Sequence, residues 1–388
     1  MNKYTYKKMI RNHLTKLFIW KNTIGKSIEK KILFSSFDGK QYSCNPRAIS
    51  EKMHELYPEF EIVWYLNAKD KYNIVPSYVR VVSSHNDFLK EIATSFCVVN
   101  NRQYENWIYK RNRQLFVQTW HGDLAPKKVL YDAWTSLEES KGKPVPIVDN
   151  KVTDYCIAGS NLGESVFRKA FRYNGTIIKN GMPRNDRLSI NDPSYDKYIK
   201  DLLGIDYEKK IVLYAPTFRD WQSGAQKPTV DFGRIVDILN KRPNEKWIGL
   251  VRAHVGFTLD QQYGDNIIDV TDYPDMADLL FASDFLVTDY SSCAGDFVLR
   301  KRPVVLAIFD YDDYQNNYRS LNMDLKASGF IFALNQESLE KIVGSYNISD
   351  FEMASQEVIK KYGIVQNSKS SDKICEIINE QYHKIFNL

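Results

Sequence analysis

Apolar residues along this chain gather into short runs that alternate with longer segments of helical periodicity. Short apolar runs predict buried strands, and their alternation with helices is typical of parallel sheets with crossover connections. In the first part of the chain we expect strands at 32–37, 61–66, 79–82, 96–99, 115–119, 154–158 and 176–179, and helices at 46–57, 87–94 and 162–171. This part therefore reads as a doubly wound α/β unit.

The same pattern starts again after a cluster of chain-breaking residues. Residues 179–186 combine Gly, Pro and Asn, which favour turns over regular structure. Beyond them we expect strands at 211–215, 247–251, 267–270, 285–287 and 304–308, and helices at 232–240, 276–281, 339–346 and 371–386. We therefore predict an N-terminal segment, 1–31, and two doubly wound domains, 32–180 and 181–388. A single large α/β domain is the alternative that the pattern leaves open.

The N-terminal segment is basic and amphipathic. Lysine and arginine recur through residues 1–31 against a single acidic residue, Glu29. Ile10, Leu14, Leu17 and Phe18 follow the three-to-four spacing of one helix face. Such a face can lie in a membrane interface with its lysines on anionic head groups, so we expect an anionic membrane surface as a partner. A solvated helix docked on its own domain is the alternative.

Composition favours a folded protein of the cytoplasm. Of its 388 residues 43% are hydrophobic, the net charge is +5, and its five cysteines show no CxxC spacing that suggests a metal site. No apolar run approaches the roughly 20 residues that span a bilayer, and no signal-peptide pattern opens the chain. No recognisable nucleic-acid module follows the basic segment. We therefore expect peripheral attachment to the cytoplasmic face of the membrane and no nucleic-acid partner.

Chemically capable residues follow four of the predicted strands. His121 and Gly122 close the run 115–119, and Thr217 and Arg219 follow 211–215. Arg252 and His254 follow 247–251, and Asp289, Ser291 and Ser292 follow 285–287. Ligands of open α/β sheets bind in the crevice at the carboxyl ends of strands. Four such ends with Arg, His, Ser or Thr indicate a shared site for an anionic substrate.

Together these segments carry a resemblance. Residues 118–122, 214–219, 252–254 and 288–292, followed by Asp296-Phe297 and Lys301-Arg302-Pro303, resemble the CDP-glycerol glycerophosphotransferase family of teichoic acid primases and polymerases. The resemblance runs from about residue 121 to about residue 310, and it departs from the usual Thr-Pro-Leu-Lys after the His-Gly pair. It implies two Rossmann-like domains facing a cleft, the GT-B architecture. The first domain would hold the acceptor and the second the CDP-polyol.

The family reaction assigns a role to each residue. An acceptor hydroxyl must lose a proton as it attacks the β-phosphorus and CMP leaves, and His121 suits that general base, with Asp123 orienting or charge-balancing the ring. The diphosphate needs fixed donors and positive charge. We assign these to Thr217, Arg219, Arg252, His254, Ser291 and Ser292, with Gly122 permitting close backbone approach. Asp289 either binds a substrate hydroxyl or braces its loop. We expect no metal and no further cofactor.

The predicted function is therefore transfer of glycerol phosphate, or a related polyol phosphate, from CDP-glycerol or CDP-ribitol to a lipid-linked or growing teichoic acid or capsule acceptor. A GT-B sugar-nucleotide glycosyltransferase of surface polysaccharide synthesis is the alternative. A non-catalytic polymer-binding protein is a third class, but the chain keeps His121, His254 and both serines, which such a protein would not need.

Overall fold

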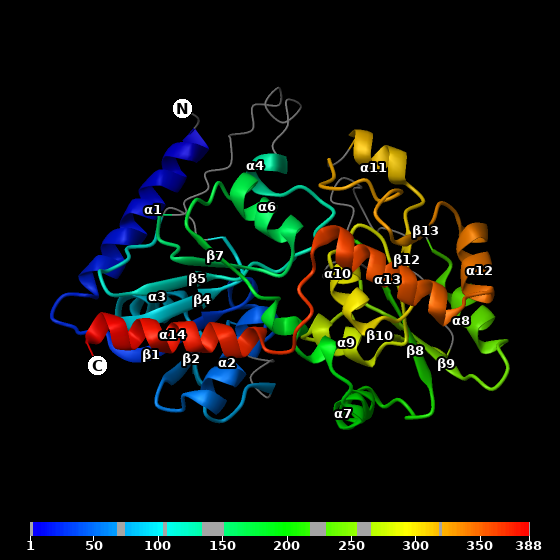
Figure 1. The fold of residues 1–388 in the computed structure, drawn as a ribbon. Helices are drawn as coiled ribbons and strands as arrows, with labels where there is room; N and C mark the ends of the chain where they lie inside the picture. Colours follow the sequence, from blue (N-terminus) through cyan, green and yellow to red (C-terminus); the bar gives the residue numbers. More distant parts are fainter. Residues whose placement is uncertain are drawn as a thin grey trace.

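Two parallel β-sheets lie side by side, each between layers of helices (Figure 1). This computed structural model describes residues 3–67, 74–103, 107–133, 151–217, 230–253, 265–317 and 320–387. The first sheet has the order β3-β2-β1-β4-β5-β6-β7. Its strands are β1 Glu29–Ser35, β2 Glu61–Tyr65, β3 Arg80–Val82, β4 Ser95–Asn100, β5 Leu115–Gln118, β6 Tyr155–Ala158 and β7 Thr176–Lys179.

The second sheet repeats this winding. Its order is β10-β9-β8-β11-β12-β13, and its paired strands run parallel. The strands are β8 Lys210–Ala215, β9 Trp247–Val251, β10 Ile267–Asp269, β11 Phe285–Thr288, β12 Val304–Ala307 and β13 Ile331–Ala333. Strand order reverses between β1 and β4 and between β8 and β11. In open α/β sheets such reversals mark the crevices that bind ligands.

Helices pack on both faces of the first sheet, against side chains that alternate along its strands. Ile32 and Phe34 of β1 pack with helix α2, Cys44–Leu56, and helix α14, Ser370–Phe386. Leu33 points to the opposite face, where it packs with helix α3, His85–Thr94, and with Ile19 of helix α1, Lys3–Lys21. Helix α6, Asn161–Lys169, covers β6. Because successive side chains of β1 point to opposite faces of the sheet, helices pack on both faces.

The second sheet is covered in the same way. Phe232 and Val236 of helix α8, Phe232–Asn240, pack on one face with helix α12, Gln336–Gly344. The other face meets α7 Pro193–Leu203, α9 Met276–Ala282, α10 Cys293–Phe297 and α13 Ile348–Tyr362. Short elements complete the fold: α4 Leu130–Ala133, α11 Tyr311–Asn317, and the 3-10 turns η1 Phe37–Gly39, η3 Pro183–Asn185, η4 Arg187–Ser189 and η5 Val298–Arg300.

Helix α14 follows the second sheet in the chain but packs on the first. Ile374, Cys375 and Ile378 lie in the core beneath β1, and Figure 1 shows α14 beside α2. The predicted domain ranges 32–180 and 181–388 stay a prediction, but α14 belongs to the second range in sequence and packs on the sheet of the first.

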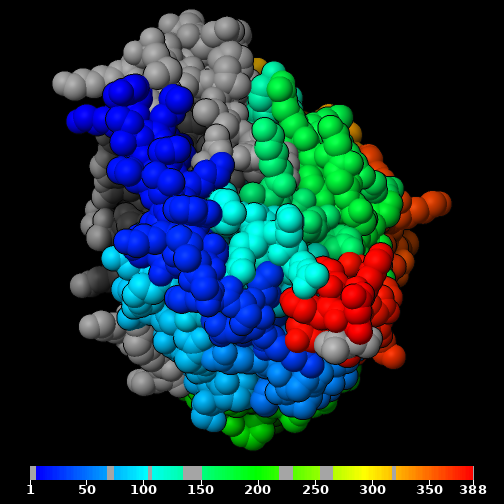
Figure 2. All heavy atoms as spheres, turned by 90° about the vertical axis from the view of Figure 1, so that its left-hand side faces the viewer, coloured from blue at the N-terminus to red at the C-terminus, as the bar shows by residue number. Residues whose placement is uncertain are grey.

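Helix α1 forms where the basic segment was expected, but its apolar residues divide between two sides. Ile19 is fully buried and Phe18 packs beside it, so the helix is docked on the first sheet's layer. Leu17 is 45% exposed, and Tyr6, Met9 and Trp20 are exposed with it at helical spacing. Figure 2 shows α1 along the surface. Among the described residues no helix is long and apolar enough to cross a membrane.

Candidate active site

His121 follows β5 at the crevice between β1 and β4. Its ring contacts the ring of Phe37, which follows β1, at 5.2 Å between centroids. Its Nδ1 lies 2.8 Å from the carbonyl oxygen of Asn101, which follows β4. A carbonyl oxygen only accepts, so Nδ1 carries the proton and Nε2 of the neutral ring carries a lone pair. This is the tautomer that a general base needs.

The surroundings of His121 keep its ring neutral. The pKa of His121 is lowered to about 4, mainly by burial and also by the nearby cations Arg102 and Arg184, while the hydrogen bond with the Asn101 carbonyl opposes this shift. A histidine with this pKa is uncharged near neutral pH, so Nε2 can accept a proton from a hydroxyl.

The residue before His121 is held in an unusual conformation. Trp120 has a φ of 53°, a left-handed backbone that a bulky residue rarely adopts. Its N–H donates to Oε1 of Gln118 at 2.8 Å, and its carbonyl accepts from Nδ2 of Asn45 at 3.1 Å. Strain of this kind persists only where neighbours enforce it, and it is frequent at functional sites. Asn45 on α2 therefore fixes the direction of the His121 loop.

The segment after His121 packs against helix α10, which covers the second sheet. A Cβ on Gly122 would lie 3.0 Å from Oγ of Ser292, at the start of α10. A Cβ on Gly295 would lie 2.4 Å from Cβ of Leu124, so α10 and this loop touch closely. Oγ of Ser291 accepts the N–H of Cys293 at 3.4 Å. The predicted base and the predicted serines, far apart in sequence, are thus neighbours.

Asp123 does not take the position that the sequence suggested. Its carboxylate is buried and accepts the N–H of Gly159 at 2.7 Å, beside the start of α6. A Cβ on Gly163 would lie 1.9 Å from Oδ1, so glycine makes room for the carboxylate. The predicted orientation of the imidazole by Asp123 is therefore wrong: the Asn101 carbonyl holds the ring, while Asp123 anchors the loop to α6.

Asp289 joins the two central strand ends of the second sheet. Its Oδ1 accepts the N–H of Thr217, which follows β8, at 2.9 Å and the N–H of Tyr290 at 2.6 Å. These contacts correspond to the loop-bracing alternative. They place Thr217 at the crevice between β8 and β11.

Arg252 brings positive charge to the same edge of the second sheet. It follows β9, and its backbone N–H donates to the carbonyl oxygen of Tyr214 at 2.9 Å. Its Nη1 is buried and has no hydrogen-bond acceptor within the described ranges. Burial lowers the pKa of Arg252, and Asp275 opposes that shift. A guanidinium with a buried donor to spare suits a phosphate oxygen. Arg219 and His254 lie outside the residues that the structure describes.

A buried ion pair that the sequence did not reveal links η3, which packs against α2 of the first sheet, to α10 of the second. Arg184 in η3 forms a two-pronged contact with Asp296 in α10, with Nη2 2.9 Å and Nε 3.1 Å from Oδ2. Asn185 donates to the other oxygen, Oδ1, at 2.7 Å. The backbone N–H of Arg184 donates to Oδ1 of Asn45 at 3.1 Å. Asn45, Arg184 and Asp296 thus connect the His121 loop to the helix that follows Ser292.

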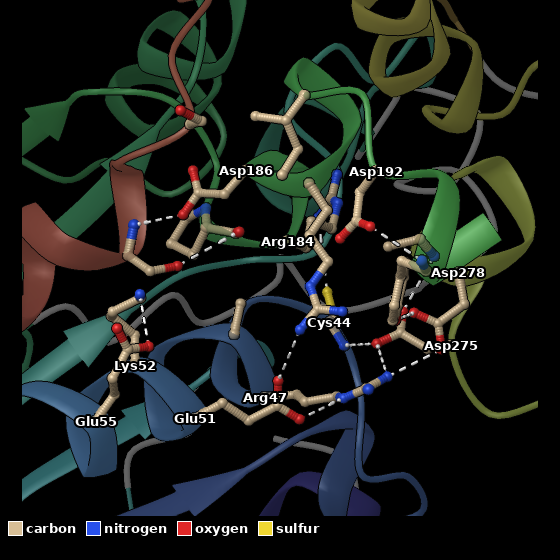
Figure 3. A pocket seen from close by; sticks show the side chains of 18 residues that line it. Cys44, Arg47, Glu51, Lys52, Glu55, Arg184, Asp186, Asp192, Asp275 and Asp278 are labelled. Carbon is tan, nitrogen blue, oxygen red and sulfur yellow. Dashed lines mark hydrogen bonds and ion pairs between the residues drawn. The ribbon is translucent and has the colours of Figure 1, made fainter. Parts of the chain in front are cut away.

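A cavity of about 360 Å³ lies beside this ion pair, between α2 and α9 (Figure 3). Nη1 of Arg47 lies 3.0 Å from Oδ2 of Asp278 and 3.3 Å from Oδ2 of Asp275. His121 and Ser292 do not line it. Because Arg47 and Arg184 already face carboxylates here, this cavity suits a diphosphate less well than the surroundings of Arg252.

Comparison with known proteins agrees with this geometry. Residues 19–380 match the family described as CDP-Glycerol:Poly(glycerophosphate) glycerophosphotransferase. The chain belongs to this family. It is a transferase, as predicted from the strand-end motifs, and the family match does not favour the glycosyltransferase alternative.

Individual relatives match nearly end to end. The chain is 29% identical to the teichoic acid glycerol-phosphate transferase of Staphylococcus aureus, over 97% of this chain and 100% of the relative. It is 31% identical to the teichoic acid poly(glycerol phosphate) polymerase of Bacillus spizizenii, over 90% and 91%. The structure of the wall teichoic acid polymerase TagF superposes with a TM-score of 0.81 at 25% identity, over 100% of both chains. The predicted GT-B fold is confirmed.

Proposed function

We propose that this glycerophosphotransferase moves glycerol phosphate from CDP-glycerol to a lipid-linked or growing teichoic acid chain and releases CMP. The observation that carries the proposal is the neutral His121, with its Nε2 lone pair, on a loop packed against Ser292. The names of the full-length relatives support glycerol phosphate as the transferred group.

The mechanism uses residues from both sheets. Nε2 of His121 accepts the proton of the acceptor hydroxyl, whose oxygen forms a new bond to the β-phosphorus of CDP-glycerol. The bond from that phosphorus to the bridging oxygen breaks, and CMP leaves with the electron pair. Arg252 stabilises the charge on the departing phosphate, and Thr217, Ser291 and Ser292 donate to phosphate oxygens. We assign His254 and Arg219 to the same diphosphate, and Gly122 lets the backbone approach it.

The direct test supplies purified protein with membrane extract and either CDP-glycerol or CDP-ribitol, and measures CMP release. CMP release from CDP-glycerol supports the proposal. Release from CDP-ribitol alone would mean that the transferred group is ribitol phosphate. No release from either donor, under conditions in which a teichoic acid glycerol-phosphate transferase of known activity works, would contradict it.

Arg252 provides a test of the donor site. Arg252→Ala should raise the KM for CDP-glycerol by roughly tenfold or more and also lower kcat, because a charge-assisted hydrogen bond is worth about 1.5–3 kcal/mol. Steady-state kinetics with varied donor gives both constants. Arg234→Ala is the matched control, since its side chain is 64% exposed on α8. A fall in kcat with unchanged donor KM would contradict the assignment.

We also propose that α1 attaches the enzyme to the anionic surface of the membrane. Tyr6, Met9, Leu17 and Trp20 form an exposed apolar stripe at helical spacing. Lysines lie on the same helix. This combination of an apolar stripe and cations is typical of a helix that lies in a membrane interface.

Substitution tests this attachment without disturbing the core. Met9→Ser/Leu17→Ser/Trp20→Ser should abolish sedimentation with anionic liposomes, because each buried apolar side chain contributes about 1.5–3 kcal/mol. Leu202→Ser/Tyr198→Ser, on exposed positions of α7, should sediment as wild type does. Binding should also weaken as salt is raised, since each lysine near the surface adds about 1 kcal/mol. Undiminished sedimentation of the triple variant would remove α1 as the attachment site.

A further inference from the structure

A groove of about 970 Å³ runs between α1 and the body of the first domain. Lys7 and Arg11 of α1 line one side of it. Asp38, Arg102 and Trp120, which follow β1, β4 and β5, line the other. The groove therefore joins the helix α1 to the carboxyl edge of the first sheet, where His121 lies.

His121 does not itself line the groove, but it adjoins the end that Trp120 lines. The ring of Trp120 lies 4.0 Å from the ring of His121, centroid to centroid. The other two groove residues of this edge follow directly on residues that touch His121: Asp38 comes after Phe37, and Arg102 comes after Asn101. Arg102 is also close enough to His121 for its positive charge to lower the pKa of the imidazole.

The lining of the groove combines cations and aromatic rings with aliphatic and uncharged polar side chains. Lys7, Arg11 and Arg102 contribute positive charge, whereas Asp38 is the acidic residue among the described residues that line it. Asp38 pairs with Nε of Arg102 at 3.1 Å, but the Arg102 side chain is 47% exposed, unlike the more buried pairs of Arg47 and Arg184. Trp107 and Trp120 add aromatic faces against which carbon chains can pack. Spaced cations beside apolar surface complement a chain in which phosphates alternate with short carbon units.

We propose that this groove binds the phosphodiester chain of the acceptor, with its terminal hydroxyl at His121 and its preceding phosphates at Arg102 and Arg11. This inference rests on the function proposed above. It places the acceptor on the Trp120 side of His121 and the donor on the Ser292 side. The base then lies between the two substrates, as in-line transfer from one to the other requires.

The test uses a water-soluble glycerol-phosphate oligomer as acceptor, in the absence of membranes. Arg11→Gln and Arg102→Gln should each raise the KM for this oligomer by roughly tenfold, because each removes a charge-assisted contact. The KM for CDP-glycerol should not change. Lys90→Gln is the matched control, since Lys90 lies on α3 beside the groove residue Leu89 but outside the lining. Arg11 and Arg102 are exposed, so neither substitution threatens the fold.

Calorimetric binding of the oligomer without any donor separates this inference from the proposed function. Wild type should bind the phosphate oligomer, both variants should bind it about tenfold more weakly, and an uncharged glycerol oligomer should not bind. If the enzyme releases no CMP but the binding pattern holds, the groove stands and the proposed reaction fails. Equal binding by wild type and both variants, or a matching rise in donor KM, would overturn the groove as the acceptor site.

Discussion

Replacing His121 with alanine is expected to lower kcat by at least roughly a hundredfold, because general-base catalysis is typically worth a factor of about 10² to 10⁴. The donor should bind nearly as before, since the diphosphate is assigned to Arg252 and its neighbours. Single-turnover CMP release and equilibrium binding of CDP-glycerol measure the two effects separately. His54→Ala is the control, because the ring of His54 stacks on that of Tyr78, 3.6 Å between centroids, outside the predicted site. An unchanged rate in His121→Ala would mean that another group takes the proton.

The pH dependence of the wild type gives a second view of the same residue. The base works only when it is neutral, and its pKa is lowered to about 4. Activity limited by this group should therefore be constant from pH 7 down to about 5 and fall as the pH approaches 4. A histidine with its ordinary pKa would instead lose activity from about pH 6.5. A decline centred there would contradict the lowered pKa of His121.

The sequence predicted most of the strands and the residues that follow them. Strand ends are readable because an apolar run must stop where the chain meets the crevice, and His121, Thr217 and Arg252 all lie within three residues of a strand end. Their catalytic and binding roles stay predictions. Helix α13 was missed, although Asn347 caps its start and Gly363, with a φ of 59°, ends it. Strand β13, Ile331–Ala333, was also missed.

The hydrophobic and polar pattern of the sequence could not predict contacts between residues far apart in the chain. Asn45 holds Trp120 from another part of the chain, and nothing near either residue indicates the pairing. Asp123 illustrates the opposite error, because its closeness to His121 in sequence suggested a contact. The fold instead directs its carboxylate to Gly159 and the glycine-lined start of α6. Side-chain partners are set by tertiary packing, which a local pattern does not encode.

The buried ion pair of Arg184 and Asp296 should dominate the stability of the region between the sheets. Asp296→Ala is expected to lower the apparent free energy of unfolding by about 3–5 kcal/mol, because Arg184 would remain buried without its partner carboxylate. Urea denaturation followed by tryptophan fluorescence measures this loss. Asp201→Ala is the matched control: it breaks a pair whose two side chains are each 61% exposed, so it should cost less than about 0.5 kcal/mol. Equal losses in the two variants would contradict a buried pair.

Removing both charges separates stability from catalysis. Arg184→Met/Asp296→Leu should recover much of the lost stability, because similar apolar volume replaces two buried charges. Arg184 also lowers the pKa of His121, so its loss should raise that pKa above about 4. The acid limb of the pH–rate profile should therefore move to higher pH in the double variant, while Asp201→Ala keeps the wild-type profile. A double variant that regains stability with an unshifted acid limb would show that the charge of Arg184 does not reach the base.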